Sequence, residues 1–105
     1  MEMKLLEKFV IKRDGRLANW DSFRIQAAIF KAALFGKYSK NPIKANELAN
    51  NVTKVVEKTI AQSNFEKVPI DEIQNVVIRE LSDFDKDVAQ DFLQYKTKRD
   101  IERMK

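Results

Sequence analysis

Cationic side chains that could hold an anion gather around one predicted turn. Lys12, Arg13 and Arg16 flank Asp14-Gly15. Asp-Gly favours a two-residue hairpin turn, because both of its residues tolerate positive φ. Such a turn places Arg13 opposite Arg16, with their Cβ atoms about 5 Å apart. Two arginines this close repel each other unless they splay into water or share an anion, and the sequence alone leaves both outcomes open.

The hairpin, predicted over residues 8–20, must be positioned by elements that are otherwise helical. Its two-residue turn predicts three facing pairs: Phe9 with Trp20, Lys12 with Leu17, and Arg13 with Arg16. Residues 67–69 form a short extended segment that can add a third strand, because Pro69 favours extended backbone in the residue before it. Apolar residues at helical spacing predict helices over residues 22–35, 45–62, 71–82 and 86–104. The pattern predicts an α+β fold in which a four-helix bundle is capped by a small three-stranded sheet.

Composition excludes much chemistry. The chain has 105 residues, the size of a single domain over 1–105, with a net charge of +4 and neither cysteine nor histidine. It therefore has no thiolate, no imidazole base and no zinc ribbon. With two glycines it cannot build a P-loop. We expect binding without catalysis, with no catalytic residue and no membrane span, in a cytoplasmic protein.

Further cations lie at the start of the first predicted helix and at the end of the last. Arg24 falls in a first helical turn, where free N–H groups also attract anions. The final helix ends in Lys96, Lys98, Arg99, Arg103 and Lys105. Each set has a simpler explanation, because solvated arginines are common and the helix dipole favours cations in a last turn. Together with the hairpin they bring enough cations for a polyphosphate, and Asp14 or an acidic helix residue could hold Mg²⁺.

Several segments follow one another in an ordered set: Val10-Ile11-Lys12-Arg13-Asp14-Gly15, Arg24-Ile25, Ala28-Ile29-Phe30-Lys31-Ala32, Val68-Pro69-Ile70-Asp71-Glu72-Ile73-Gln74, Val88-Ala89-Gln90-Asp91-Phe92-Leu93-Gln94-Tyr95-Lys96 and Arg99-Asp100-Ile101-Glu102-Arg103. This set resembles the ATP-cone, the nucleotide-binding regulatory domain of ribonucleotide reductases and of their transcriptional repressor. The resemblance covers roughly residues 8 to 103. It is strongest to the N-terminal cone of anaerobic, class III ribonucleoside-triphosphate reductases.

The resemblance implies that ATP or dATP binds under the hairpin as an effector. In that family pattern Val10 and Ile11 would flank the adenine, and Lys12 and Arg13 would meet the phosphates. Arg24 stands where the family usually has a phosphate-facing lysine. Tyr95, Lys98 and Arg99 would form the other wall of the site. The implied nucleotide-binding residues are therefore Val10, Ile11, Lys12, Arg13, Arg24, Tyr95, Lys98 and Arg99.

The same resemblance implies allosteric control of a ribonucleotide reductase, through nucleotide-dependent conformation or oligomerisation. The implied partners are an adenine nucleotide, the catalytic portion of the reductase and a second cone. Because this chain lacks the cysteines of the reductase and of the repressor, we expect an isolated cone or a fragment.

Two other functions remain as alternatives. A basic helical domain can bind nucleic acid, although here the aromatic residues do not alternate with cations as stacking platforms do. A degenerate cone could act only as an interaction module, since Ala18 stands where many cones have a glutamate.

Overall fold

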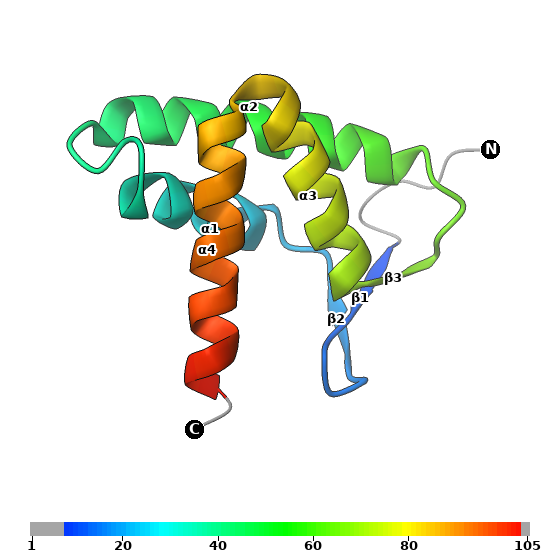
Figure 1. Cartoon of the computed structure of the whole chain (residues 1–105). Coiled ribbons are helices and arrows are strands. Elements are labelled where there is room, and N and C mark those ends of the chain that lie inside the picture. The colour runs from blue at the N-terminus through cyan, green and yellow to red at the C-terminus, as the bar shows by residue number, and fades with distance from the viewer. Residues whose placement is uncertain (1–7, 104–105) are drawn as a thin grey trace.

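Four helices and a three-stranded sheet make up residues 8–103, the part of the chain that the computed structural model describes (Figure 1). In chain order they are β1 (Phe9–Ile11), β2 (Leu17–Asn19), α1 (Ser22–Phe35), α2 (Pro42–Ala61), β3 (Lys67–Pro69), α3 (Ile70–Phe84) and α4 (Lys86–Arg103). The predicted α+β fold is confirmed. The last predicted helical residue, at position 104, lies outside the described residues.

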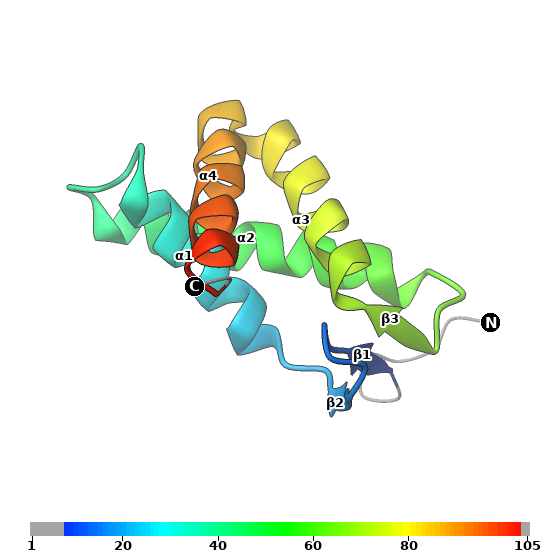
Figure 2. The same ribbon diagram turned by 60° about the horizontal axis from the view of Figure 1, so that its bottom comes forward.

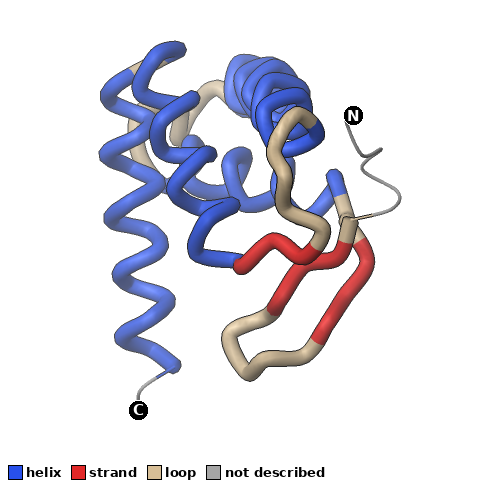
Figure 3. Tube along the Cα trace, turned by 90° about the vertical axis from the view of Figure 1, so that its right-hand side faces the viewer, coloured by secondary structure: helices blue, strands red, loops and turns tan. Residues whose placement is uncertain are grey.

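The sheet lies at one end of the helices (Figure 3). Its strand order is β2-β1-β3, with β1 antiparallel to β2 and parallel to β3. The predicted third strand is therefore confirmed. Val68 in β3 is fully buried and joins the core, and β3 runs directly into α3. The sheet is thus attached to the helical body through β3.

The predicted register of the hairpin is wrong by one residue. The facing pairs are Phe9 with Asn19, Val10 with Ala18, and Ile11 with Leu17. The loop has three residues, because the Gly15 N–H donates to the Lys12 carbonyl at 2.9 Å and the Lys12 N–H donates to the Arg16 carbonyl at 2.8 Å. Gly15 has φ +86°, which is typical of the glycine that closes a three-residue hairpin loop. Arg13 therefore lies within the loop and does not face Arg16.

The helix starts follow their caps. The Asp21 side chain accepts from the Phe23 N–H at 3.0 Å, which confirms the predicted start of α1. Helix α2 begins at Pro42 instead of residue 45, because Asn41 accepts from the Lys44 N–H at 3.2 Å and proline suits a first helical position. Helix α3 is longer than predicted, at 70–84 instead of 71–82. No helix within residues 8–103 has both the length and the apolar character needed to cross a membrane.

The helices pack around a core of small and branched apolar residues. Helix α2 packs on α1 and α3, and α4 packs on both of these helices from the other side (Figure 2). The buried apolar residues are Ile29, Ala32, Ala33, Ala45, Ala49, Val52, Val56, Ile60, Val68, Ile73, Val76, Val77, Leu81, Val88, Ala89 and Phe92. On α4 this burial stops at Phe92. The last turns of α4 therefore extend beyond the core.

Two buried polar contacts fix the hairpin against α2 and the segment that follows it. The Lys8 side chain is 1 % exposed and donates from Nζ to the carbonyls of Ser63 and Phe65. Glu57 accepts from Trp20 Nε1 at 2.7 Å and from the Ser22 hydroxyl. Buried polar groups need such partners, so both contacts limit how far the sheet can shift relative to the helices.

Helix α1 ends at Phe35, as the predicted range 22–35 has it, and Gly36 follows it without a left-handed conformation. Its φ is −121°, which any residue can adopt. A Cβ atom at this position would overlap the carboxyl group of Asp91 on α4. That carboxylate accepts the Lys37 N–H at 2.7 Å. Gly36 thus leaves room for the Asp91 carboxylate against the end of α1, and a larger residue would force that side chain to move.

Candidate functional site

The hairpin loop and the last turns of α4 project from the same side of the helical body (Figures 1 and 3). Between them lies a cleft of about 490 Å³, within the size range of small-molecule sites. Its floor and walls come from the hairpin, α1, α3 and α4. The lining residues are Lys12, Arg13, Asp14, Arg16, Arg24, Ala28, Ile70, Gln74, Phe92, Tyr95, Lys96, Arg99 and Asp100.

The cleft carries a net positive charge. Six of its lining residues are lysine or arginine and two are aspartate. The cations come from the hairpin, from the first turn of α1 and from the end of α4, so segments far apart in the sequence meet here. Within residues 8–103, Lys12 and Arg99 take part in no ion pair. The cleft therefore has cations left over for an anionic ligand with several charges.

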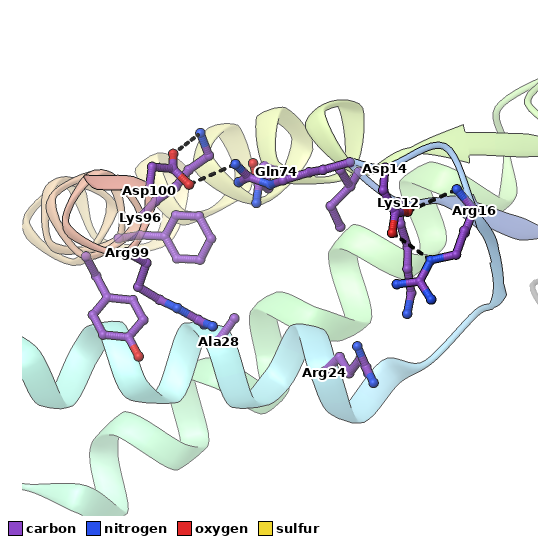
Figure 4. A pocket seen from close by; sticks show the side chains of 13 residues that line it. Lys12, Asp14, Arg16, Arg24, Ala28, Gln74, Lys96, Arg99 and Asp100 are labelled. Atoms are coloured by element: carbon purple, nitrogen blue, oxygen red, sulfur yellow. Dashed lines mark hydrogen bonds and ion pairs between the residues drawn. The ribbon is translucent and has the colours of Figure 1, made fainter. Parts of the chain in front are cut away.

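One of the two aspartates links the walls of the cleft. Asp100 Oδ1 lies 2.8 Å from Arg13 Nη1, and its Oδ2 lies 3.6 Å from Lys96 Nζ (Figure 4). Partial desolvation raises the pKa of Asp100, but the charges and hydrogen bonds of Arg13 and Lys96 outweigh it and hold the pKa below its ordinary value. Asp100 is therefore a carboxylate at neutral pH and occupies two of the cations.

The other aspartate belongs to the loop. Asp14 accepts the Arg16 backbone N–H at 3.1 Å and pairs with Arg16 Nε at 2.6 Å. The backbone hydrogen bond from Arg16 is the main cause of the lowered pKa of Asp14; desolvation opposes it, and the Arg16 guanidinium lowers the pKa further. No three metal-ligating side chains cluster within residues 8–103. In this structure the Asp14 carboxylate is thus paired with Arg16.

A second, mostly apolar cavity of about 220 Å³ adjoins the cleft and shares Lys12, Arg24 and Ile70 with it. It lies beneath the hairpin. The residues that line it without lining the cleft are Val10, Ala18, Asn19, Trp20, Asp21, Ile25 and Ile73. The site as a whole is thus a cationic cleft that opens into a smaller apolar cavity under the sheet.

The α3 and α4 sides of the cleft add an aromatic surface and an unpaired amide. Phe92 and Tyr95 line it, and the Arg99 guanidinium carbon lies 5.9 Å from the centre of the Tyr95 ring. Gln74 of α3 lies between the hairpin loop and the end of α4 (Figure 4). Its Oε1 is buried without a hydrogen-bond partner among the described residues. Native proteins rarely leave such an atom unpaired, so a ligand group is a natural partner for it.

Most of the residues that the sequence singled out meet at this site. Lys12, Arg13, Arg24, Tyr95 and Arg99 line the cleft, and Val10 lines the adjoining cavity. Two others, Ile11 and Lys98, line neither space. The Lys98 ammonium instead lies 5.6 Å from the centre of the Phe35 ring, on another face of α4.

Among the polar residues that line the cleft, sequence reasoning left out Gln74 and Asp100, and it noted Arg16 and Lys96 only as cations without assigning them to the nucleotide. One feature of the sequence could have pointed to Gln74: it is a polar residue one helical turn after Ile70, on a helix face that is otherwise apolar and faces inward. No such feature points to Asp100, because its partner Arg13 is 87 residues away in the chain.

This small α+β domain brings cations from three elements to one open cleft, an arrangement that suits a polyanionic ligand. The sequence model of the ATP cone domain matches residues 8–101, so the chain belongs to the ATP cone family. Domains of this family bind ATP or dATP and act in nucleotide-dependent regulation. No curated protein sequence matches the chain significantly.

Proposed function

We propose that this chain is the regulatory domain of a ribonucleotide reductase, and that it binds ATP or dATP as an effector without turning it over. One observation carries the proposal: six cationic side chains line a cleft that adjoins a mostly apolar cavity and shares three lining residues with it. A nucleoside triphosphate has this same division, with a flat apolar base at one end and several negative charges at the other. Family membership supports the nucleotide, and the geometry supports where each part of it lies.

The adenine fits the smaller cavity and the phosphates fit the cleft. Val10, Ile25 and Ile73 supply apolar surface for the base, while Asn19 supplies a polar group at its edge. Lys12 lines both spaces and therefore lies where the sugar meets the phosphate chain. From there the phosphates extend toward the cations of α4. Charge-assisted hydrogen bonds to these cations provide most of the affinity.

The proposed absence of turnover follows from the charges in the cleft. Its two carboxylates, Asp14 and Asp100, are each held by an arginine and have lowered pKa values. Neither is placed to accept a proton from an attacking water near neutral pH. The cleft has no histidine or cysteine, because the chain has none. Any magnesium ion would arrive with the nucleotide, bound to its phosphates.

We propose that regulation works through a difference in affinity between two states of the reductase. ATP and dATP differ only in the 2′-hydroxyl, so that group must change the pose of the ligand, the stoichiometry or the exposed surface. The partners in this proposal are the catalytic portion of the reductase and a second cone. The Arg99-Asp100-Ile101-Glu102-Arg103 ending favours an anaerobic, class III enzyme, and the expected location is the cytoplasm.

Titration calorimetry and thermal denaturation with ATP, dATP and inorganic triphosphate test the proposal. Binding to the native state must raise the melting temperature, and the rise grows with the logarithm of the ligand concentration once that exceeds Kd. We expect both nucleotides to bind in the micromolar to millimolar range and more tightly than inorganic triphosphate. Absence of heat and of stabilisation with either nucleotide at millimolar concentration would refute the proposal and would favour a degenerate cone.

A further inference from the structure

Asp100 occupies cations that the proposed ligand needs. Its carboxylate lies 2.8 Å from Arg13 Nη1 and 3.6 Å from Lys96 Nζ. Both cations line the cleft on the side away from the apolar cavity. A carboxylate and a phosphate cannot both take the same N–H donors of one guanidinium. An anion that reaches the donors that Asp100 holds must therefore compete with Asp100.

The same contact joins the hairpin loop to the end of α4. Within residues 8–103, Arg13 with Asp100 is the only hydrogen bond or ion pair between the hairpin and α4. Arg13 sits in the three-residue loop, outside the ladder of β1 and β2. Asp100 sits in the part of α4 that extends beyond the core, after the last buried residue, Phe92. Both ends of the contact thus lie on segments with little packing of their own.

The contact is weak enough to be displaced. The Arg13 side chain is 41 % exposed and the Asp100 side chain 32 %. Partly exposed ion pairs contribute little stability, because water and salt screen them. A triphosphate presents several charges to the same cations and gains charge-assisted hydrogen bonds from each. Its terminal phosphates therefore outcompete a single carboxylate, whereas a monophosphate at the cavity end of the cleft leaves Asp100 in place.

We propose that Asp100 is a displaceable anion that links the hairpin loop to the end of α4 in the free protein. The terminal phosphates of a bound triphosphate replace it on Arg13 and Lys96, which releases the last turns of α4 from the hairpin. The identity of the ligand rests on the proposed function, but the displacement needs only a polyphosphate. The contact converts occupancy of the cleft into a change at the end of α4, where Leu93 and Ile101 are exposed.

A distance measurement tests the release directly. The chain has no cysteine, so a Leu17→Cys, Ile101→Cys pair can carry two spin labels. Leu17 and Ile101 are 51 % and 53 % exposed, and neither lines the cleft or the apolar cavity. We expect ATP and inorganic triphosphate to lengthen the label distance, and AMP to leave it unchanged. In the Asp100→Asn protein the longer distance should be present without ligand.

Asp87→Asn is the matched control. Asp87 is on the same helix and pairs with Lys37, but it lies about 20 Å from Asp100 at the helical rise per residue. Both variants change the net charge equally. By calorimetry, Asp100→Asn should bind ATP about two- to fivefold more tightly, the factor expected for losing competition from a partly exposed ion pair. Its AMP affinity should match wild type, and Asp87→Asn should match wild type with both ligands.

The outcomes separate this inference from the proposed function. An unchanged label distance at saturating inorganic triphosphate overturns the displacement, as does an Asp100→Asn protein whose distance without ligand equals that of wild type. If inorganic triphosphate lengthens the distance and neither ATP nor dATP binds, the displacement stands and the proposed nucleotide function falls. If neither nucleotide nor triphosphate binds, both are wrong.

Discussion

Lys12 is the residue whose loss should weaken nucleotide binding most. Lys12 is half-buried and lines both the cleft, next to the hairpin loop, and the apolar cavity. Within residues 8–103 it makes no ion pair, so its charge is not offset by a carboxylate. We therefore expect Lys12→Ala to remove a full charged contact with phosphate.

The expected size follows from that contact. A hydrogen bond to a charged group contributes about 1.5–3 kcal/mol, which corresponds to a loss of about 10- to 150-fold in ATP affinity. Arg13→Ala should weaken binding as well, but by less, because the ligand no longer has to displace Asp100 from Arg13. The order of the two effects, Lys12 greater than Arg13, is a consequence of the structure that the sequence pattern does not contain.

Titration calorimetry with ATP measures both variants, and Lys67→Ala provides the control. Lys67 is an exposed lysine of β3, in the same sheet, and lines neither the cleft nor the cavity. Thermal denaturation without ligand should show that all three variants remain folded. If Lys12→Ala binds ATP as tightly as wild type, Lys12 does not contact the ligand. If Lys67→Ala loses as much as Lys12→Ala, only the net charge matters and the assigned cleft is wrong.

Three further outcomes are expected. ATP should change the fluorescence of Trp20, the single tryptophan, because Trp20 lines the cavity assigned to adenine. Inorganic triphosphate should change this fluorescence little, and an equal response to both ligands would place the base elsewhere. Gly36→Ala should lower the free energy of unfolding in urea by about 1–3 kcal/mol, because the added Cβ overlaps Asp91; a wild-type midpoint would contradict that close contact. Burial by itself raises the pKa of Asp85. Hydrogen bonds from the Lys37 side chain and the backbone together have the larger, opposite effect, so the pKa lies below its ordinary value of 3.8. The ionised Asp85 therefore stabilises the fold above pH 3.8, and this contribution is lost as the pH falls through the lower pKa of the folded state. The difference in free energy of unfolding between wild type and Asp85→Asn should therefore shrink in acid. A difference that does not change with pH would contradict the lowered pKa of Asp85.

Local chemistry in the sequence was enough to determine the elements of this protein. The cap at Asp21 acts through the N–H groups of its own helix, and Pro69 gave a local signal for extended backbone at residues 67–69. Helical spacing of apolar residues likewise located all four helices to within a few residues. Such signals can be predicted from sequence because the interacting groups are neighbours in the chain. The ordered motifs also indicated the family, and most of the binding residues that they implied line the cleft or the adjoining cavity.

Contacts between distant segments were decided only by the tertiary structure. Whether Asp14-Gly15 closes a two- or three-residue loop depends on the pairing of both strands, and that choice took Arg13 out of the ladder. Once in the loop, Arg13 met Asp100, a residue 87 positions away. The sequence thus determined which cations this protein has, while the packing of α4 and the hairpin decided which of them are left for a ligand, because electrostatic pairing depends on distance in space and not on distance along the chain.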